Sequence, residues 1–241
     1  MREAGRIAAE ALHRVGEMVR PGVSTLDLDR EAEKVIRSRG ATCEFRGYHG
    51  YPANICTSVN EVVVHGIPSA DRILKEGDIV GIDIGARYRG FVGDNARTFP
   101  VGEVPPEARR LLRATEESLM EAIDTVSPGV HLWKVSETVE NRARRDRFGV
   151  VREYAGHGIG TRMHEEPQVP NYVDRGSRHG RLTLEPGFVI CIEPMLNAGG
   201  DEVEVLDDGW TVVTKDRSLS AHFEHMVAVL ADGCEVLTTY P

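Results

Sequence analysis

Residues 77–95 read Gly-Asp-Ile-Val-Gly-Ile-Asp-Ile-Gly-Ala-Arg-Tyr-Arg-Gly-Phe-Val-Gly-Asp-Asn, and the prediction of the fold starts from this segment. The apolar run over residues 80–84 is typical of a β-strand. Residues 86–90 are predicted to form a turn, after which the chain returns through Phe91 to Asp94. Two strands joined by a short loop that contains glycine form an antiparallel hairpin, so the segment predicts the first hairpin of an antiparallel sheet.

Such a hairpin brings two carboxylates, those of Asp83 and Asp94, side by side among Ile and Val residues. An aspartate is rarely buried unless it is paired or holds a metal ion. The alternative is one aspartate satisfied within the turn and another at a strand end. The pair alone does not decide between the two, and the decision needs ligands from elsewhere in the chain.

The composition is that of an ordinary soluble globular protein, with 41% hydrophobic and 28% charged residues in a chain of 241. A net charge of −9 disfavours broad binding to DNA, to other nucleic acids or to an anionic membrane. Cysteines 43, 56, 191 and 234 are scattered without a CxxC pair, which indicates reduced thiols. No apolar stretch of signal-peptide or membrane-spanning length occurs, so a soluble protein of the cytoplasm is expected. A monomer is the expected oligomeric state.

Helices are predicted from apolar residues at helical spacing. The first covers residues 1–19, the second begins after a cap at Ser24 or Thr25, the third begins at Pro106 and the fourth lies around residues 135–143. A strand-like run over residues 55–64 separates the second helix from the hairpin.

Two segments of the first half recur in the second. Residues 19–23, Val-Arg-Pro-Gly-Val, are matched by residues 126–130, Val-Ser-Pro-Gly-Val. Residues 77–83 are matched by residues 187–193, Gly-Phe-Val-Ile-Cys-Ile-Glu, and both segments end in an acid. Helices, turn and acid therefore follow the same order twice.

This repeat predicts a single domain, residues 1–241, made of two α/β halves at about 1–105 and 106–241. The acids that end the repeated segments would meet between the halves, where binding sites commonly lie.

Further candidate ligands lie in the second half. His157 stands between glycines, which allow the backbone to approach a bound group closely, and His164 follows seven residues later. Glu193 ends an apolar segment and Glu224 leads into one. A lone histidine is more often structural, but this context favours a site.

Several carboxylates with apolar neighbours require a counter-charge, because they would otherwise repel one another and their pKa values would rise. Few Lys or Arg residues stand near these acids in the sequence, so divalent cations are the economical answer. Two Asp, two Glu and one His suit two ions that share bridging carboxylates. Oxygen-rich donors with one imidazole favour Mn, Fe, Co or Zn without choosing among them.

These ligands occur in order with a series of short motifs. The motifs are YHGYP (48–52), NEVVVHGIP (60–68), GHGIG (156–160), HEEPQVP (164–170), IEPM (192–195), DGWTV (208–212) and TKDRSLSAHFEH (214–225). Together they resemble the methionine aminopeptidases over essentially the whole chain, and the short interval between HEEP and IEPM resembles the type I (bacterial) branch. The resemblance implies the pseudo-symmetric "pita-bread" fold, in which helices flank a central antiparallel sheet.

The resemblance also implies roles. Two divalent metal ions per chain would be bound by Asp83, Asp94, His157, Glu193 and Glu224. His164 would hydrogen-bond the scissile carbonyl, His65 would contact the substrate, and Glu193 or a neighbouring carboxylate would accept protons. The implied activity is removal of the initiator methionine from nascent proteins and peptides, preferably before a small second residue.

A pocket with apolar and aromatic walls would suit the unbranched thioether of methionine. The residues that the resemblance implies are Phe45, Tyr48, His49, Tyr51, Cys56, Met163 and Trp210, and for Tyr51 and Trp210 a place in the ordinary core is the alternative. Phe45 and Met163 depart from the Cys and the aromatic residue that relatives carry there, so the shape of the pocket is open. A monovalent-cation site near Asn60, Val62 and Ser220 is implied in the same way.

Four arginines, Arg142, Arg144, Arg145 and Arg147, end the fourth predicted helix of an otherwise acidic chain. Positive charge at that end is favoured by the helix dipole, so a solvated helix end is the simpler interpretation. The alternative is transient docking on ribosomal RNA, close to emerging N-termini.

Two other functions compete with this prediction. An Xaa-Pro aminopeptidase or prolidase shares the fold and the ligands, but such chains usually carry a further N-terminal domain and lack the NEVVVHGIP and DRSLSAHFEH motifs. A non-catalytic binding protein on this fold would have lost metal ligands, and here the whole ligand set is present.

Overall fold

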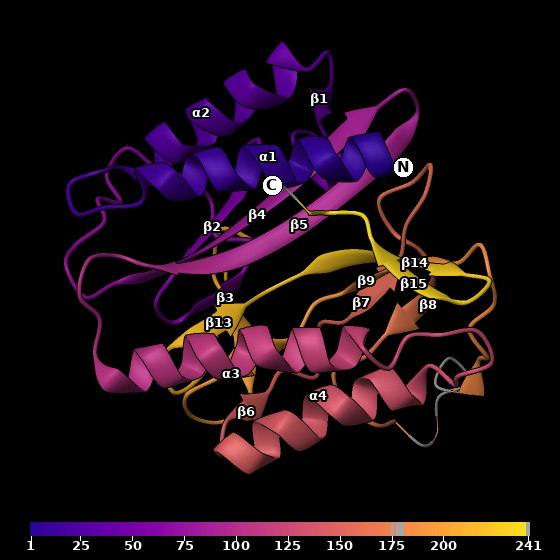
Figure 1. Ribbon diagram of the computed structural model, residues 1–241. Helices are drawn as coiled ribbons and strands as arrows, with labels where there is room; N and C mark the ends of the chain where they lie inside the picture. The colour runs from indigo at the N-terminus through magenta and orange to yellow at the C-terminus, as the bar shows by residue number, and fades with distance from the viewer. Residues whose placement is uncertain (175, 177–180, 240–241) are drawn as a thin grey trace.

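The computed structural model describes residues 1–174, 176 and 181–239. Its helices lie in two pairs, one over the strands of each half of the chain (Figure 1). No helix within these residues is both long and apolar enough to cross a membrane. All four cysteines carry free thiols, as their spacing predicts.

The first helix pair follows the predicted stripes. Helix α1 spans Arg2–Met18 and α2 spans Thr25–Ser38, and the Ser24 hydroxyl caps α2 by accepting a hydrogen bond of 3.1 Å from the amide of Asp27. Their buried faces, which include Ile7, Leu28 and Ile36, meet the strands of the first half.

The second pair consists of α3 (Pro106–Ile123) and α4 (Trp133–Asp146). Pro106 occupies the first turn of α3, where a missing backbone N–H costs nothing. Leu111, Leu119, Val135 and Val139 form the buried contact between this pair and the strands of the second half.

The opening hairpin exists, but its turn is shorter than predicted. Strand β4 spans Ile79–Tyr88 and β5 spans Phe91–Pro100, so only Arg89 and Gly90 connect them. Both residues have positive φ (50° and 86°), the conformation that a tight two-residue hairpin requires. The predicted turn over residues 86–90 was wrong because strand β1 (Thr42–Cys43) pairs with β4 at residues 86 and 87 and extends it.

Register places Asp83 and Asp94 diagonally on one face of the hairpin. Asp83 lies opposite Ala96, and Asp94 lies opposite Gly85. Residues two apart on a strand share a face, so the two carboxylates point the same way. The pair is diagonal rather than directly opposed.

The predicted strand over residues 55–64 is two strands. β2 (Cys56–Val59) pairs with β4, whereas β3 (Val62–Val64) pairs with β12 (Val212–Thr214), which also pairs with β11 (Val203–Val205). The break falls at Asn60, whose φ of 58° reverses the chain.

The second half is built on a five-stranded antiparallel sheet. Its order is β15 (Gly233–Val236), β14 (His225–Leu230), β9 (Val189–Ile192), β7 (Gly156–Gly158) and β8 (Glu165–Val169). A small sheet of β13 (Ser220–His222), β10 (Met195–Asn197) and β6 (Gly149–Val150) lies beside it. The amide of Glu224 donates to the carbonyl of Ala96 at 2.8 Å and joins this half to β5.

The two Pro-Gly turns form the same hydrogen bonds in both halves. The amide of Gly22 donates to the carbonyl of Leu74 at 2.8 Å, and the amide of Gly129 donates to the carbonyl of Leu184 at 2.9 Å. Both glycines have positive φ, 90° and 86°. Each half has its own core, and a third apolar cluster, which includes Phe45, Tyr51, Cys56 and Met163, lies between them.

Candidate metal centre

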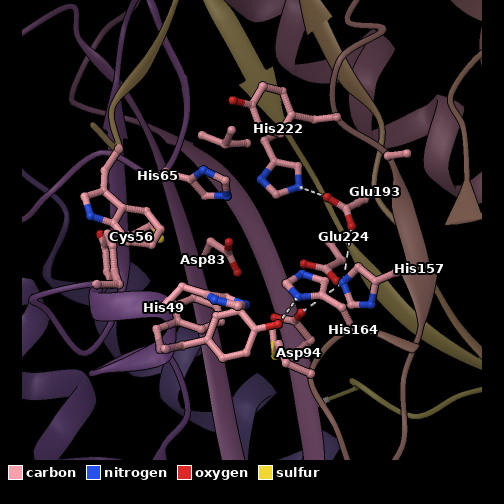
Figure 2. A pocket seen from close by; sticks show the side chains of 18 residues that line it. His49, Cys56, His65, Asp83, Asp94, His157, His164, Glu193, His222 and Glu224 are labelled. Carbon is pink, nitrogen blue, oxygen red and sulfur yellow. Dashed lines mark hydrogen bonds and ion pairs between the residues drawn. The ribbon is translucent and has the colours of Figure 1, made fainter. Parts of the chain in front are cut away.

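A cavity of about 400 Å³ is lined by residues from both halves of the molecule. Every residue predicted for metal or substrate lines it: Phe45, Tyr48, His49, Tyr51, Cys56, His65, Asp83, Asp94, His157, Met163, His164, Glu193, Trp210 and Glu224. Figure 2 shows the carboxylates and imidazoles pointing toward one another across this space.

The candidate ligands come from different elements. Asp83 and Asp94 stand within the long strands β4 and β5, and His157 lies in β7. Glu193 directly follows β9, and Glu224 directly precedes β14. The antiparallel pairing of β9 with β14 carries the two glutamates to the same end of the second sheet.

Burial leaves several acid oxygens without a partner. Asp94 and Glu224 are 3% and 2% exposed, and the buried atoms Asp83 Oδ1, Asp94 Oδ1 and Glu224 Oε1 have no hydrogen-bond partner among the described residues. Burial, together with the neighbouring carboxylates, raises the pKa of Asp83 and of Glu224 well above the usual range. No Lys or Arg lines the described part of the cavity, so no fixed positive charge offsets these acids.

His157 supplies the nearest positive charge. Its Nε2 lies 3.6 Å from Asp94 Oδ2 and 3.5 Å from Glu193 Oε1, while its Nδ1 lies 2.9 Å from the carbonyl of Gly158. Burial lowers the pKa of His157, but Asp94 and Glu193 overcome that effect and raise it to about 9. The bond to Gly158 directs Nε2 at the carboxylates, which is the orientation that a metal-binding imidazole needs.

His164 and His65 both line the cavity next to the acid cluster (Figure 2). The ring centroid of His164 lies 4.3 Å from that of His157, and its Nδ1 lies 2.6 Å from the hydroxyl of Tyr48. Burial and the charge of His157 lower the pKa of His164 to about 4. Burial also lowers the pKa of His65, so both imidazoles are neutral at pH 7.

Aromatic and apolar side chains form the rest of the wall. The hydroxyl of Tyr51 lies 3.1 Å from the carbonyl of Ile55 and 3.0 Å from that of Gly66, and its ring packs edge-on against Trp210 at 5.1 Å. Tyr51 therefore presents its ring, with its polar atom already satisfied, and belongs both to the core and to the cavity wall.

Two residues near the acids were missed by the sequence prediction. His222 is buried and its Nε2 lies 3.5 Å from Glu193 Oε2. The sulfur of Cys191 lies with ligand atoms of Asp94, His157 and Glu224 in a group whose members are within 4.8 Å of one another. Strand alternation offered a signal for both, because residue 222 shares a face with 224, and residue 191 with 193.

A hydrogen-bond network backs the acids on the far side of the hairpin. The amide of Asp94 donates to Met226 Sδ at 3.2 Å, and the amide of Met226 donates to Thr238 Oγ1 at 3.1 Å. Thr238 Oγ1 also lies 2.8 Å from His225 Nδ1, and Asn95 Nδ2 donates to the carbonyl of Glu224. The network links the strand that carries Asp94 to the segment that carries Glu224.

The residues implied for a monovalent cation lie together, but their polar atoms are engaged. The carbonyl of Asn60 accepts a hydrogen bond of 2.8 Å from the amide of Ser220, and Asn60 Nδ2 donates to Asp78 at 2.8 Å. Val62 begins β3 beside them. The cation itself stays a prediction.

The arginine cluster is largely neutralised. Arg142 is 8% exposed and forms ion pairs with Glu117, Glu121 and Asp146, so it ties α4 to α3 and is not available to a phosphate. Arg145 pairs with Glu121 at 3.0 Å, and Arg144 lies 3.5 Å from Glu140. The ion pairs of Arg142 speak against a direct part in docking, because α3 supplies carboxylates that the local sequence does not reveal. Contact with the ribosome itself stays a prediction.

The donor set fits divalent cations. Buried carboxylate oxygens that lack partners, next to an oriented imidazole, are stable in charged form only when a cation supplies the missing contacts. Oxygen donors with one nitrogen suit Mn, Fe, Co or Zn. The fold and this cluster together define a metal-dependent hydrolase.

The chain belongs to metallopeptidase family M24, whose model matches residues 1–231. It is 46% identical to methionine aminopeptidase 1 of Bacillus subtilis (99% of this chain, 94% of the relative). It is 48% identical to the methionine aminopeptidase of Escherichia coli K12 (99% and 89%). The crystal structure of methionine aminopeptidase from Thermotoga maritima superposes with a TM-score of 0.96 at 40% identity, covering 100% of this chain and 95% of that one.

These similarities confirm two predictions made from the sequence. The resemblance to type I methionine aminopeptidases holds over nearly the whole chain. The pita-bread fold is confirmed by the close superposition.

Proposed function

We propose that the chain is a divalent-metal-dependent aminopeptidase that removes N-terminal methionine from nascent proteins and peptides. The observation that carries the proposal is one cavity in which an acid cluster, with three buried carboxylate oxygens that lack a partner among the described residues, adjoins an apolar, aromatic wall. The acid cluster suits metal-assisted hydrolysis, and the wall suits a flexible thioether side chain.

The ligands in this proposal are Asp83, Asp94, His157, Glu193 and Glu224, which would hold two divalent ions. Such ions lower the pKa of water toward neutrality and polarise a carbonyl. Among these ligands, Glu193 is the best placed to accept a proton as well. Its side chain is more exposed than that of Glu224. Its two carboxylate oxygens lie 3.5 Å from Nε2 of His157 and 3.5 Å from Nε2 of His222.

The neutral histidines would act on the substrate. His164, held through its Nδ1 by Tyr48, would present Nε2 to the scissile carbonyl and stabilise the oxyanion that develops on it. His65 packs edge-on against Tyr154 at 5.5 Å, which orients its ring toward the cavity. Because both rings are neutral, each can offer one N–H without bringing a positive charge beside the metal ligands.

The cavity supports specificity for methionine. Phe45, Tyr51, Cys56, Met163 and Trp210 give it apolar walls, and its volume of about 400 Å³ accommodates one long side chain with the adjoining residue. A small second residue would fit best, since the same volume has to hold it. The residues that depart from the family pattern, Phe45 and Met163, are both buried on this wall.

We infer the setting of the enzyme from the same proposal. The halves 1–105 and 106–241 would act as one catalytic domain, because the proposed site draws ligands from both. Because its substrates would be nascent chains, the enzyme would work in the cytoplasm, and we infer that it acts as a monomer. Of the four arginines, Arg144, Arg145 and Arg147 would provide the transient contact with the ribosome.

The test uses the full chain, stripped of metal by a chelator and reloaded with Mn²⁺, Fe²⁺, Co²⁺ or Zn²⁺ under anaerobic conditions. Release of methionine from a Met-Gly peptide should return with at least one cation and be absent without any. Preference for an Xaa-Pro peptide would favour the prolidase-like alternative. Full methionine release by the chelated chain would overturn the metal-dependent proposal.

A further inference from the structure

Cys191 lies close to three of the candidate metal ligands and has no part in the function proposed above. It stands in the middle of the second sheet, opposite Met226 of β14. On its other side, the pairing of Gly158 with Ile190 places His157 beside Cys191. Alternation along the strands therefore puts the thiol on the same face as His157 and Glu193.

The thiol and three candidate ligands form a compact group of four donors. The Cys191 sulfur, one carboxylate oxygen each from Asp94 and Glu224, and one nitrogen of His157 all lie within 4.8 Å of one another. All four residues are buried, and Cys191 is 0% exposed. Asp94 Oδ1 and Glu224 Oε1 lack hydrogen-bond partners, so the group has open acceptor capacity toward its centre.

The spacing is close to that of a tetrahedral cation site. Donors at about 2.0–2.3 Å from a tetrahedral ion are separated by about 3.3–3.8 Å from one another. The donor atoms are at most 4.8 Å apart, so binding a tetrahedral ion would require any two of them to move closer by at most about 1.5 Å. Side-chain rotations within the rotamer wells supply movements of that size.

We propose that Cys191 is a sulfur ligand that makes this centre bind thiophilic divalent cations, such as Cd²⁺ and Zn²⁺, through Asp94, His157, Cys191 and Glu224. One sulfur, one nitrogen and two carboxylate oxygens supply four donors, the number that a tetrahedral zinc ion takes, and the sulfur favours thiophilic ions over hard ones. The inference rests on the proposed metal-dependent function, but it adds a ligand and a preference among cations.

The proton balance follows from the burial of the thiol. Cys191 is a free thiol that is 0% exposed, and a thiol in such surroundings keeps its proton while no cation is bound, so the cation-free centre holds an S–H group. Binding forms a sulfur–metal bond, breaks the S–H bond and releases one proton to solvent. Hard cations such as Mn²⁺ prefer oxygen and gain little from the sulfur.

The experiment loads the chelated full chain anaerobically with Co²⁺ and records the near-ultraviolet thiolate-to-cobalt charge-transfer band. The band should appear in the unchanged chain, vanish in Cys191→Ser and persist in Cys56→Ser. Cys56 is the matched control because it is another buried thiol, which lines the cavity but does not belong to the group of four donors. Cd²⁺ affinity should fall at least about 10-fold in Cys191→Ser, and more than Mn²⁺ affinity does.

The inference would be overturned if the chain without substitutions showed no charge-transfer band. It would also be overturned if the band survived in Cys191→Ser. The first outcome does not depend on how well the variants fold. In either case the thiol only donates a hydrogen bond to Glu224. Methionine release by the Mn²⁺-loaded unchanged chain separates the two proposals. If release occurs without the band, only the sulfur ligand is wrong, and if no cation restores release, the proposed function itself is wrong.

Discussion

The two halves of the molecule supply ligands to one centre in different ways. The first half places Asp83 and Asp94 within an unbroken hairpin of two ten-residue strands, β4 and β5. The second half uses shorter strands and sets Glu193 and Glu224 just outside the ends of β9 and β14. Ladder pairs precede and follow each aspartate along its strand, whereas the two glutamates lie beyond the last ladder pair of β9 and β14.

Equivalent strands make the difference clearer. Ile82 pairs with Arg97 in the first half, and Ile192 pairs with His225 in the second. The next pair in the first half is Asp83 with Ala96. The corresponding next pair in the second half would be Glu193 with Glu224, but the ladder ends before it. Glu224 does not pair with Glu193, and its amide donates instead to the carbonyl of Ala96 at 2.8 Å. The contact that breaks the symmetry is therefore the contact that joins the halves.

The largest expected effect is loss of a ligand from the rigid half. Asp94→Asn should keep the fold, because the change preserves side-chain shape, and should lower kcat/KM by more than about 100-fold, beyond the loss typical of residues behind the ligands. Steady-state release of methionine and metal stoichiometry measure it. Glu193→Gln is the comparison from the second half. Near-normal turnover in Asp94→Asn would contradict a metal role for the hairpin.

The next effect is on stability as a function of pH in the metal-free chain. Burial and neighbouring acids raise the pKa of Asp83 and Glu224 in the folded state, and the pKa of His157 is raised to about 9. The folded chain then binds more protons than the unfolded chain, so its free energy of unfolding falls as pH rises. We expect a loss of at least about 1 kcal/mol between about pH 7 and about pH 9.5.

Urea unfolding of the chelated chain at several pH values measures this loss. Saturating Mn²⁺ should remove most of it, because the cation replaces the bound protons. His164, whose pKa is lowered to about 4, has the opposite sign and acts only as pH falls below about 6.5. A flat profile for the metal-free chain between pH 7 and pH 9.5 would contradict the burial of unpaired acids.

A smaller effect is expected from the network behind the ligands. Thr238→Val removes the hydroxyl that accepts from the amide of Met226 and contacts His225, and so loosens the link between Asp94 and Glu224. Metal affinity should fall about 10-fold. Thr115→Val is the matched control, because it removes another buried threonine hydroxyl, one that bonds only within α3. Equal losses of affinity in both variants would indicate general destabilisation.

The features that could be predicted from the sequence are those with local signals, and most of the features that were missed depend on contacts between distant segments. The helices, the hairpin and the ligands on it carry local signals, namely stripes, caps and acids among apolar residues. The turn at Arg89-Gly90 and the break at Asn60 could not be located, because pairing partners distant in sequence set them. The ion pairs of Arg142 were missed for the same reason, since they depend on how α3 and α4 pack. Cys191 was missed although it alternates with Glu193 along one strand, a local signal that the sequence did offer.

The smallest effect tests a contact that crosses between the halves. Tyr48 begins the short helix η1 (Tyr48–Gly50) in the first half, and its hydroxyl lies 2.6 Å from Nδ1 of His164 in the second. A net hydrogen bond contributes about 0.5–1.5 kcal/mol, so Tyr48→Phe should lower kcat by about 2- to 10-fold. The loss should appear in kcat rather than in KM if the bond orients His164 toward the developing oxyanion. His164→Gln should remove the dependence on Tyr48 altogether, and additive losses in the double variant would contradict that coupling.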